Sequence, residues 1–562
     1  MAKEKSKAKK IIIPVVAVVL AAALIVTGYF CLYKPKHGGT NEYGGGSDTK
    51  KSVELTPEKV SYETADYKGY KLPEFFVEIF EQAEKDSEAA CEKYGVAMTV
   101  GDRKISATEF AMTYFDMFIY AASDEIGDPQ GLTPELTAAP ADQPYGKDEK
   151  VTWADRLKEE TQAALRKRYI LFYDALENGF MISDSVAAEL SSIKGDVEYS
   201  ADMNAKNPDA MLSESYCEGT TVCLYARNLI MRNYASEYEK ALKSTFAAAH
   251  SDSEIKGIYD KNPSKYNYID VRVLKIYSDD EEGAQRAKKE IKDLESFYDF
   301  GIDYYKDVDP HFSRIADSTT RYYFCLYDRI VEDFGSETAE WCFAKGRKAG
   351  DVEVLPGDTY ANLVYVEKPQ YSPDSVNYRE SITLFNAGGQ AAQSDDEKKE
   401  SEAAAKRQYD LLKRNDGSVE MMEEISDTYN ESFQSWNTVG VCEGVHIHEL
   451  GYSVARWMTA AERKAGDYEV LESGVGYGLF MYEGTNEGDI DAYSLIRLNL
   501  AAKEYNEYYE SLLNFNGNKA VTFGAVIEKA AQKGEKSSAA FAEKRLQRVN
   551  DAQAQAEAQT AQ

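Results

Sequence analysis

Histidine and cysteine are scarce in this sequence, with five histidines and seven cysteines among 562 residues. No Cys-x-x-Cys, His-Glu-x-x-His or Gly-x-Ser-x-Gly motif occurs, which argues against a histidine-rich metal protein and against hydrolases built on these motifs. A disulfide scaffold is not expected in a chain of this length, although Cys217 and Cys223 are close enough in sequence to pair. We therefore predict no catalytic residue, no cofactor and no metal ion.

Lysine and arginine are also few relative to aspartate and glutamate. The chain has 65 lysines and arginines against 96 aspartates and glutamates, which gives a net charge of −31 at pH 7. Phosphates would be repelled, so we expect no nucleic-acid partner. The same charge argues against a second, electrostatic contact with anionic lipid. Acidic runs such as Asp395 to Glu397 are typical of a solvated helix surface.

One long run, residues 11–33, carries no charge. As a helix it would span about 35 Å, enough to cross a hydrocarbon core about 30 Å thick. Residues 1–10 hold five lysines and one glutamate, and the positive-inside rule keeps this basic stub in the cytoplasm. We therefore predict a single-pass protein of the cell membrane, with residues 11–33 as its transmembrane helix and its bulk on the extracytoplasmic side.

Two other interpretations of the apolar run fit less well. A cleaved signal peptide would have a shorter apolar region followed by a small-x-small site, whereas this run ends in the aromatic pair Tyr29 and Phe30. Lipid attachment at Cys31 is disfavoured, because Phe30 stands where a lipobox has glycine or alanine. Residues 34–61, which include a Gly- and Ser-rich stretch, are predicted to be a flexible linker.

The next part of the chain, residues 62–265, is mainly helical in pattern. Apolar and aromatic residues recur at spacings of three and four from Phe110 to Phe118 and again from Leu224 to Leu242. The polar, proline-containing segment from Asp128 to Asp148 is predicted to be a surface loop. We interpret residues 62–265 as a helical module.

Shorter strand-like runs follow this module. Val271 to Ile276 alternates apolar and polar residues with the period of a strand. Helices are expected at Ala391 to Asn415 and at Ile490 to Asn514. Residues 488–543 are predicted to form C-terminal helices, and the Gln- and Ala-rich residues 544–562 a low-complexity tail.

An internal repeat organises the second half of the chain. The segment from Trp341 to Asp351 matches the segment from Trp457 to Asp467, at an offset of 116 residues (457 − 341). This period is too long for a solenoid and has the size of a small domain. We predict an α+β fold with two tandem domains, residues 266–372 and 373–487. Each domain ends in a helix bearing tryptophan, an Ala-Gly-Asp turn and two strands.

These units resemble the parvulin-type (PpiC) peptidyl-prolyl isomerase domain, which runs from a first strand through helices and a Gly-Glu/Asp-Val turn to a closing strand. Upstream, Ala97 to Phe110 resembles the "atVnGekIsxxEF" opening of the N-terminal chaperone module of the SurA and PrsA foldases. Ser253 to Tyr259, followed by Tyr266, resembles "eeikkyYeenkdkY". The resemblance covers residues 95–510 and implies a SurA/PrsA-like extracytoplasmic foldase.

The resemblance also implies a histidine in the first strand and another in the last, facing a cysteine or aspartate across a prolyl pocket. The first unit has Val273 and Asn362 at these positions. The second has Gly478 in its last strand and no histidine between Arg379 and Phe385. Because these polar groups are missing, we expect weak or absent isomerase turnover in both units, and no catalytic residue is carried over.

A separate hypothesis concerns metal binding by two of the histidines. His446 and His448 alternate, so they would share one face of a strand, with Glu443 and Glu449 nearby. Such a group would bind zinc if a third ligand were brought to it. The simpler interpretation, which we prefer, is a polar edge strand.

We therefore expect a membrane-anchored extracytoplasmic chaperone, with degenerate isomerase domains, that assists the folding of secreted proteins. Its partners would be unfolded or nascent secreted polypeptides, and the membrane through residues 11–33. The 41 tyrosines suit client binding, because a tyrosine ring buries apolar area while keeping a polar tip, although tyrosines also fill cores. Two alternatives stay open at this point: an active prolyl isomerase, and a non-enzymatic cell-envelope scaffold with one dedicated partner.

Overall fold

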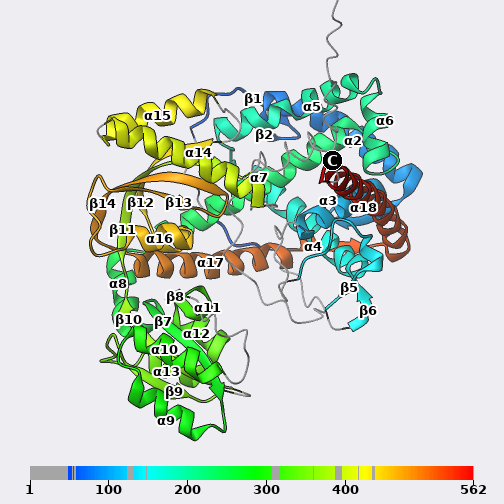
Figure 1. The fold of residues 1–562 in the computed structure, drawn as a ribbon. Helices are drawn as coiled ribbons and strands as arrows, with labels where there is room; N and C mark the ends of the chain where they lie inside the picture. Colours follow the sequence, from blue (N-terminus) through cyan, green and yellow to red (C-terminus); the bar gives the residue numbers. More distant parts are fainter. Residues whose placement is uncertain are drawn as a thin grey trace, which may run out of the picture. The chain divides into compact units, whose positions relative to one another are not determined.

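The computed structural model describes residues 49–53, 55, 59–122, 132–146, 148–306, 317–357, 360–385, 395–415, 417–432 and 437–560. The predicted basic stub, transmembrane helix and most of the linker lie outside these residues. Within the described ranges, no helix is both long and apolar enough to cross a membrane. The predicted α+β class is confirmed. The chain forms two compact units, Met1–Phe246 with Ala501–Gln562, and Ala247–Leu500 (Figure 1).

The first unit is mostly helical but also contains short strands. Its N-terminal elements are β1 (Thr64–Tyr67), β2 (Tyr70–Pro73), α2 (Glu74–Tyr94), β3 (Val96–Val100), β4 (Arg103–Ser106), α3 (Ala107–Ala122), α4 (Trp153–Glu177), α5 (Asp184–Met203), α6 (Pro208–Ser215) and α7 (Val222–Ala248). The two segments predicted from helical spacing fall in α3 and α7. The contacts end this unit near Phe246, so the helix α8 (Asp252–Lys261), which we had placed in the helical module, belongs to the second unit.

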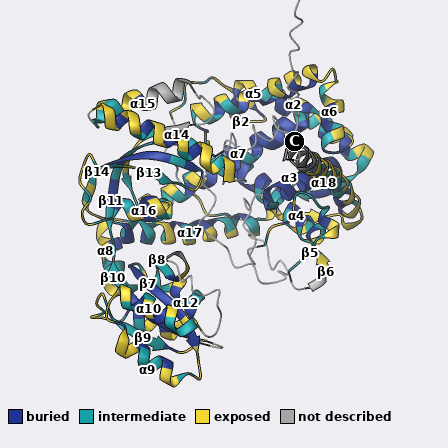
Figure 2. Cartoon of the chain, in the orientation of Figure 1, coloured by how far each residue is buried: buried dark blue, intermediate teal, exposed yellow. Residues whose placement is uncertain are grey.

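Helix α3 forms the centre of the first unit. All of its residues except the last, Ala122, are buried, so the helix is enclosed on every side (Figure 2). A helix that is apolar all round must be covered by neighbours, because no face of it is suited to water. Two of these neighbours, α4 and α18 (Gly524–Thr560), come from distant parts of the sequence.

The C-terminal segment completes the first unit. After α17 (Asp491–Asn514), the strand β15 (Ala520–Thr522) pairs with β3, and α18 then packs along α3. The two helices approach closely at Gly534, where a Cβ atom would lie 2.7 Å from Cδ1 of Tyr114 and 2.9 Å from the carbonyl oxygen of Ala111. The residues predicted as a low-complexity tail continue α18 as a helix through Thr560.

The segment predicted as a surface loop, Asp128 to Asp148, has regular structure in its described part. It contains a short 3-10 helix (Pro140–Asp142) and the strand β5 (Pro144–Tyr145), which pairs with β6 (Asp148–Thr152). The side chain of Gln143 replaces missing backbone partners, since its Nε2 donates to the carbonyl oxygens of Glu135 and Ala138 at 3.0 and 2.9 Å. The other described residues of the segment are turns and irregular backbone, so the loop prediction fails only for these short elements.

The second unit contains two four-stranded sheets of the same topology. The first has the order β8-β7-β10-β9 and the second β12-β11-β14-β13. The strands are β7 (Tyr268–Tyr277), β8 (Arg321–Cys325), β9 (Val352–Leu355), β10 (Tyr360–Tyr371), β11 (Asp374–Leu384), β12 (Asn437–Val445), β13 (Tyr468–Glu472) and β14 (Gly476–Ile490). The helices are α9 (Glu281–Glu290), α10 (Leu294–Tyr305), α11 (Asp317–Thr320), α12 (Tyr327–Phe334), α13 (Ser336–Cys342), α14 (Asp395–Arg414), α15 (Val419–Ser432) and α16 (Tyr452–Met458).

The repeated tryptophans lie at the same place in equivalent helices, Trp341 in α13 and Trp457 in α16. An arginine six residues later covers each indole ring at 3.9 Å from the ring centroid. The same arginines, Arg347 and Arg463, donate from Nε to the backbone oxygen of their tryptophan at 2.9 and 3.1 Å. One local motif therefore fixes the end of the helix and the turn into the next strand in both repeats.

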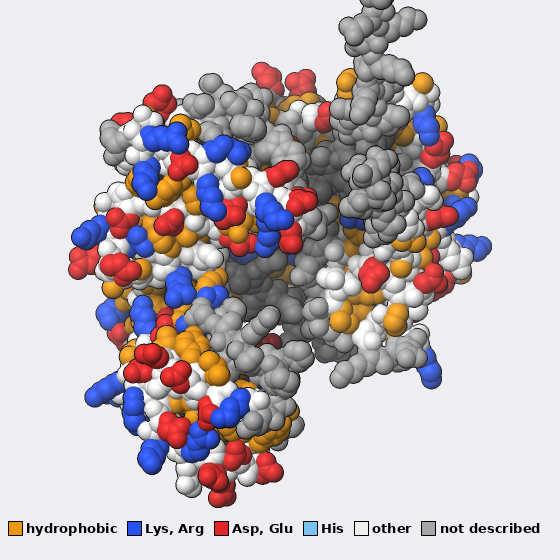
Figure 3. All heavy atoms as spheres, in the orientation of Figure 1, with side chains coloured by type: hydrophobic (Ala, Val, Ile, Leu, Met, Phe, Trp, Pro, Cys, Tyr) orange, Lys and Arg blue, Asp and Glu red, His pale blue; other side chains and the backbone are white. Residues whose placement is uncertain are grey.

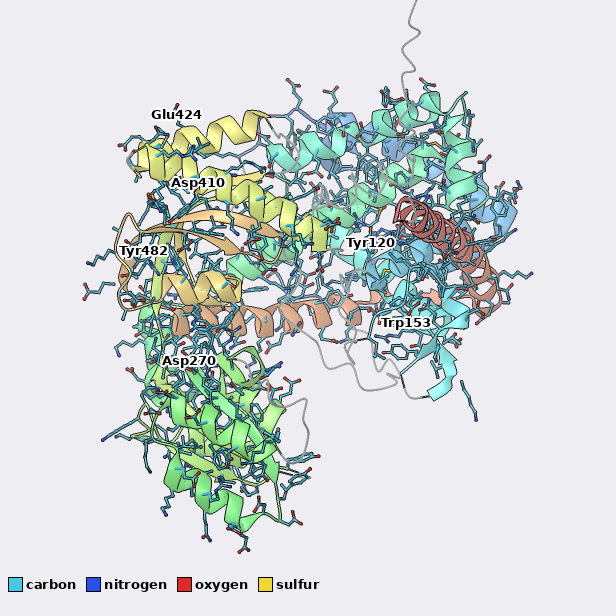
Figure 4. All side chains as sticks on the ribbon, in the orientation of Figure 1. Tyr120, Trp153, Asp270, Asp410, Glu424 and Tyr482 are labelled. Atoms are coloured by element: carbon cyan, nitrogen blue, oxygen red, sulfur yellow. The ribbon has the colours of Figure 1, made fainter. Side chains whose placement is uncertain are left out.

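The edge strands β8 and β12 are where the repeats differ. β8 has 5 residues and β12 has 9. They nevertheless keep the same register, because Ile269, Val271 and Arg272 lie opposite Cys325, Tyr322 and Arg321, while Val376, Tyr378 and Arg379 lie opposite Val445, Cys442 and Val441. In β8, Phe324 adopts φ +52°, and its N–H donates to Oδ1 of Asp270 at 2.9 Å. Asp270 is labelled in Figure 4. This left-handed residue lies next to the end of the shorter strand.

Candidate functional site

The first repeat has no open polar site at the positions where histidines were expected. Val273 is 5 % exposed and belongs to the apolar cluster on the α12–α13 face of the sheet. Asn362 is 1 % exposed, and its Nδ2 donates to the backbone oxygen of Phe334 at 3.0 Å and to Oγ1 of Thr338 at 3.1 Å. Asn362 therefore ties the end of α12 to α13, which is a structural role.

In the first repeat, Lys275 is the residue of β7 that lies directly opposite Asn362. Its Nζ donates to Oδ1 of Asn362 at 2.5 Å. The Nζ also lies 4.8 Å from the ring centroid of Phe334. Burial lowers the pKa of Lys275, an effect that Asp333 partly opposes. The buried asparagine thus has its oxygen and nitrogen hydrogen-bonded within the fold, while Lys275 remains exposed.

The second repeat excludes a side chain at the corresponding last-strand position. Gly478 lies opposite Ile382, and a Cβ atom on it would approach Cγ1 of Ile382 to 2.7 Å and Cε2 of Phe480 to 3.0 Å. Because both neighbours are packed in the core of this face, a histidine cannot be accommodated without displacing them. The sequence-based expectation that these positions lack the family's polar groups thus has a clear structural basis.

The register of the two sheets identifies one polar residue that sequence reasoning missed. Arg272 and Arg379 are equivalent, because they pair with Tyr365 and Met481, which are separated by the repeat offset (481 − 365 = 116). The next residues, Val273 and Glu380, are therefore equivalent as well. The position expected to hold a first-strand histidine is a buried valine in one repeat and a glutamate in the other.

Glu380 lies on the α16 face of its sheet. Side chains alternate along a strand, so Glu380 shares this face with Tyr378 and Ile382, both of which belong to the α16-facing apolar cluster. Burial raises the pKa of the Glu380 carboxyl group to about 7. On the same face, Tyr378 forms a hydrogen bond with the thiol of Cys442. Burial raises the pKa of both of these groups, with a further contribution from Glu380.

The two histidines singled out from the sequence do not lie on a strand, because β12 ends at Val445. His446 caps a 3-10 helix (Ile447–Glu449), and the two imidazole rings stack with centroids 5.7 Å apart. Nδ1 of His448 lies 2.9 Å from Oδ1 of Asp491, and the hydroxyl of Tyr268 donates to Oδ2 of the same aspartate at 2.7 Å. Searched over the described residues, the structure contains no group of three side chains placed to hold a metal ion.

The helical unit holds a buried charged network at the end of its β3–β4 hairpin. Ser106 and Glu109 form a reciprocal cap at the start of α3, with the Glu109 N–H donating to Oγ of Ser106 and the Ser106 N–H donating to Oε2 of Glu109, both at 3.1 Å. Oε1 of Glu109 accepts a hydrogen bond from Tyr169 at 2.8 Å and forms an ion pair with Arg227. Ser87 donates to Oε2 at 2.7 Å. The network joins α2, α3, α4 and α7.

Every cysteine within the described residues is a free thiol, including Cys217 and Cys223. Cys217 is buried, and its thiol lies 3.6 Å from the Thr108 carbonyl oxygen and the Thr220 hydroxyl.

On the visible face of the molecule, acidic and basic side chains are intermixed, with hydrophobic side chains between them (Figure 3).

The chain was compared with known proteins in three ways. No family model matches the sequence, and no curated protein matches it. Among solved structures, the chain is similar to a crystal structure of the foldase protein PrsA from Lactococcus lactis, with a TM-score of 0.18 and 12 % sequence identity. That alignment covers 62 % of this chain and 95 % of the other.

Proposed function

We propose that this protein is a membrane-anchored extracytoplasmic chaperone that holds unfolded or nascent secreted polypeptides and does not isomerise their prolyl bonds. The observation that supports this most directly is the path of the chain. A helical unit is interrupted by two α+β repeats and is then completed by β15 and α18. The resemblance noted in the sequence implies the same arrangement, with a helical chaperone module that is completed after the isomerase domains.

The expected lack of isomerase activity follows from the strand positions described above. Prolyl isomerisation crosses a barrier of about 18–20 kcal/mol, and a groove that accelerates it must desolvate and orient the peptide bond. The Asn362 side chain is hydrogen-bonded to the end of α12 and to α13. Val273 is apolar, and no side chain fits at Gly478. These substitutions remove the expected histidines from both strands of the first repeat and from the last strand of the second, in which Glu380 stands at the first-strand position.

A folding assay with a chemically denatured, proline-containing client tests the proposal. The full-length chain should suppress aggregation of the client at near-stoichiometric ratios. It should leave the slow, proline-limited refolding phase, which takes tens of seconds or more, almost unchanged. Many-fold acceleration at catalytic concentrations would favour the active isomerase. A chain that neither holds the client nor isomerises it would favour the scaffold, and a pull-down would then return one or two partners instead of many unrelated secreted proteins.

The proposed topology has its own test. Residues 11–33 carry no charge and follow a lysine-rich stub, so the bulk of the chain is expected outside the cytoplasmic membrane. Protease added to intact spheroplasts should degrade the bulk of the protein, while a cytoplasmic control protein survives. Survival of the full-length chain under the same conditions would contradict an outward orientation.

A further inference from the structure

Glu380 has no partner that the fold explains. Of the residues that the structure describes, none donates a hydrogen bond to its carboxylate or forms an ion pair with it. The neighbouring cation, Arg379, points to the opposite face, where it forms ion pairs with Glu483 and Glu423 at 2.6 Å each. A half-buried carboxylate without a partner costs free energy, because it loses water and gains no compensating bond.

The first repeat shows that the fold does not require a charge at this position. Its equivalent residue, Val273, is buried in an apolar cluster on the corresponding face. The two repeats otherwise keep the same register between the first and last strands, including the ion pairs Arg272–Glu367 and Arg379–Glu483. Of the two repeats, the second alone has a glutamate here, and the packing of the first shows that the fold does not need it.

The strand next to Glu380 carries no side chain directly opposite the carboxylate. Glu380 lies opposite Gly440 of β12, and among the described residues a Cβ atom on Gly440 would meet nothing nearer than Sγ of Cys442, at 3.8 Å. β12 is the edge strand of its sheet, and Val441 in it is 54 % exposed. An edge strand with exposed backbone groups can pair with an extended peptide.

The distances across the sheet suit a long basic side chain. Neighbouring strands lie about 4.8 Å apart, so a peptide strand added beside β12 would lie about 9.6 Å from β11. Over the side-chain-free Gly440, an extended lysine or arginine on the peptide and the glutamate on β11 together bridge this gap. The net charge of −31 also favours the approach of a basic segment.

We propose that Glu380 binds a lysine or arginine side chain of an extended polypeptide that pairs with the edge strand β12. This inference rests on the proposed function, because the ligand is a segment of a client. It assigns the second repeat, and not the first, as the one that selects basic client segments.

Fluorescence anisotropy on the full-length chain tests the inference. The probes are two labelled ten-residue peptides of high strand propensity that differ only in a central lysine or glutamine. The native chain should bind the lysine peptide about tenfold more tightly at pH 8, as expected for a hydrogen-bonded charge pair. Glu380→Gln and Glu380→Val should each remove this preference and leave the glutamine peptide unaffected. The valine variant carries the residue that the first repeat tolerates.

The pH dependence provides a second readout. Ionised Glu380 attracts lysine, so the preference for the lysine peptide should weaken as the pH falls from 8 to 6, through the raised pKa of about 7. The other titratable groups near this face include Tyr378, Cys442, Tyr482 and Glu449. Burial raises the pKa of Tyr378 and Cys442, so both stay neutral over this range. Glu449→Gln serves as the control and should retain the preference.

Equal binding of the two peptides by the native chain would overturn the inference, as would an unchanged lysine preference in both Glu380 variants. These outcomes are distinct from failure of the proposed function. A chain that suppresses aggregation but binds the lysine and glutamine peptides equally would remain a chaperone without this site. A chain that binds the lysine peptide but holds no client would keep the site and lose the chaperone assignment.

Discussion

Replacing Gly534 with leucine is expected to destabilise the helical unit by about 3 kcal/mol or more. Even a single Cβ atom at this position would lie 2.7 Å from the Tyr114 ring and 2.9 Å from a backbone oxygen of α3. The ring can rotate only against other core residues, since Tyr114 is 0 % exposed, and the backbone cannot yield locally. Overpacking of this kind costs about 1–3 kcal/mol for small misfits and more where backbone must shift. Hydrogen exchange of α3 amides, followed by mass spectrometry, measures the loss.

Gly195→Leu is the matched control for this change. Gly195 also lies inside a helix of the same unit, α5, but a Cβ atom there meets none of the described atoms within 4 Å. Leucine is the better helix former, so this variant should be as stable as the native chain or slightly more stable. Equal exchange rates in the two leucine variants would show that α18 does not pack on α3 as described.

The duplication was predictable from sequence because its signal is local. The segments from tryptophan to aspartate keep the residues that make the turn, and Arg347 and Arg463 contact their own tryptophans only six residues away. Strand order and register depend instead on pairings over about a hundred residues, which no local pattern records. The shared register of β8 and β12 on their neighbouring strands, with Ile269 opposite Cys325 and Val376 opposite Val445, was for this reason invisible in the sequence.

The prediction for His446 and His448 failed for a similar reason. Alternation suggested a strand, but a hydrogen bond to Asp491, 43 residues away, holds His448 in a 3-10 turn. Nothing in the local sequence connects the histidine to that aspartate. C-terminal helices were predicted over residues 488–543, and α18 continues beyond them through Thr560, where alanine and glutamine give little apolar periodicity.

Glu380 was overlooked because the resemblance directed attention to histidine. In an alternating strand a glutamate is usually assigned to the solvent face. Its position beside Tyr378 and Ile382 follows only from the way α16 covers the sheet. Only the structure aligns the two repeats strand by strand, and this alignment identifies Glu380 as a candidate binding residue.

Loss of the Glu109 carboxylate is expected to have a comparably large effect on the helical unit. The side chains of Glu109 and Arg227 are 5 % and 9 % exposed, so Glu109→Ala would leave a buried arginine without its counter-charge. Breaking such a pair from one side costs about 3–5 kcal/mol. The Ser106 cap at the start of α3 is lost as well. Urea unfolding with α3 hydrogen exchange as the probe measures the change.

The matched control is Glu218→Ala in the same unit, because Glu218 pairs with Lys93 at the surface, where both side chains are more than 60 % exposed. That substitution should have no measurable effect. The double variant Glu109→Leu/Arg227→Met should recover most of the stability that Glu109→Ala loses, since no buried charge then remains unpaired. A double variant as unstable as the sum of two single changes would show that the carboxylate acts independently of Arg227.

Acid unfolding gives an independent test of the same network. Burial alone would raise the pKa of Glu109, but Arg227 and the hydrogen bonds from Ser87, Ser106 and Tyr169 outweigh burial and hold the pKa below its ordinary value. The resulting stabilisation is present above the unfolded pKa of about 4.3 and is lost as the pH falls through the lower folded value. The native chain should therefore lose stability more steeply below about pH 4 than the double variant. Parallel acid profiles would contradict a lowered pKa for Glu109, because protonation of this carboxyl would then not be linked to unfolding.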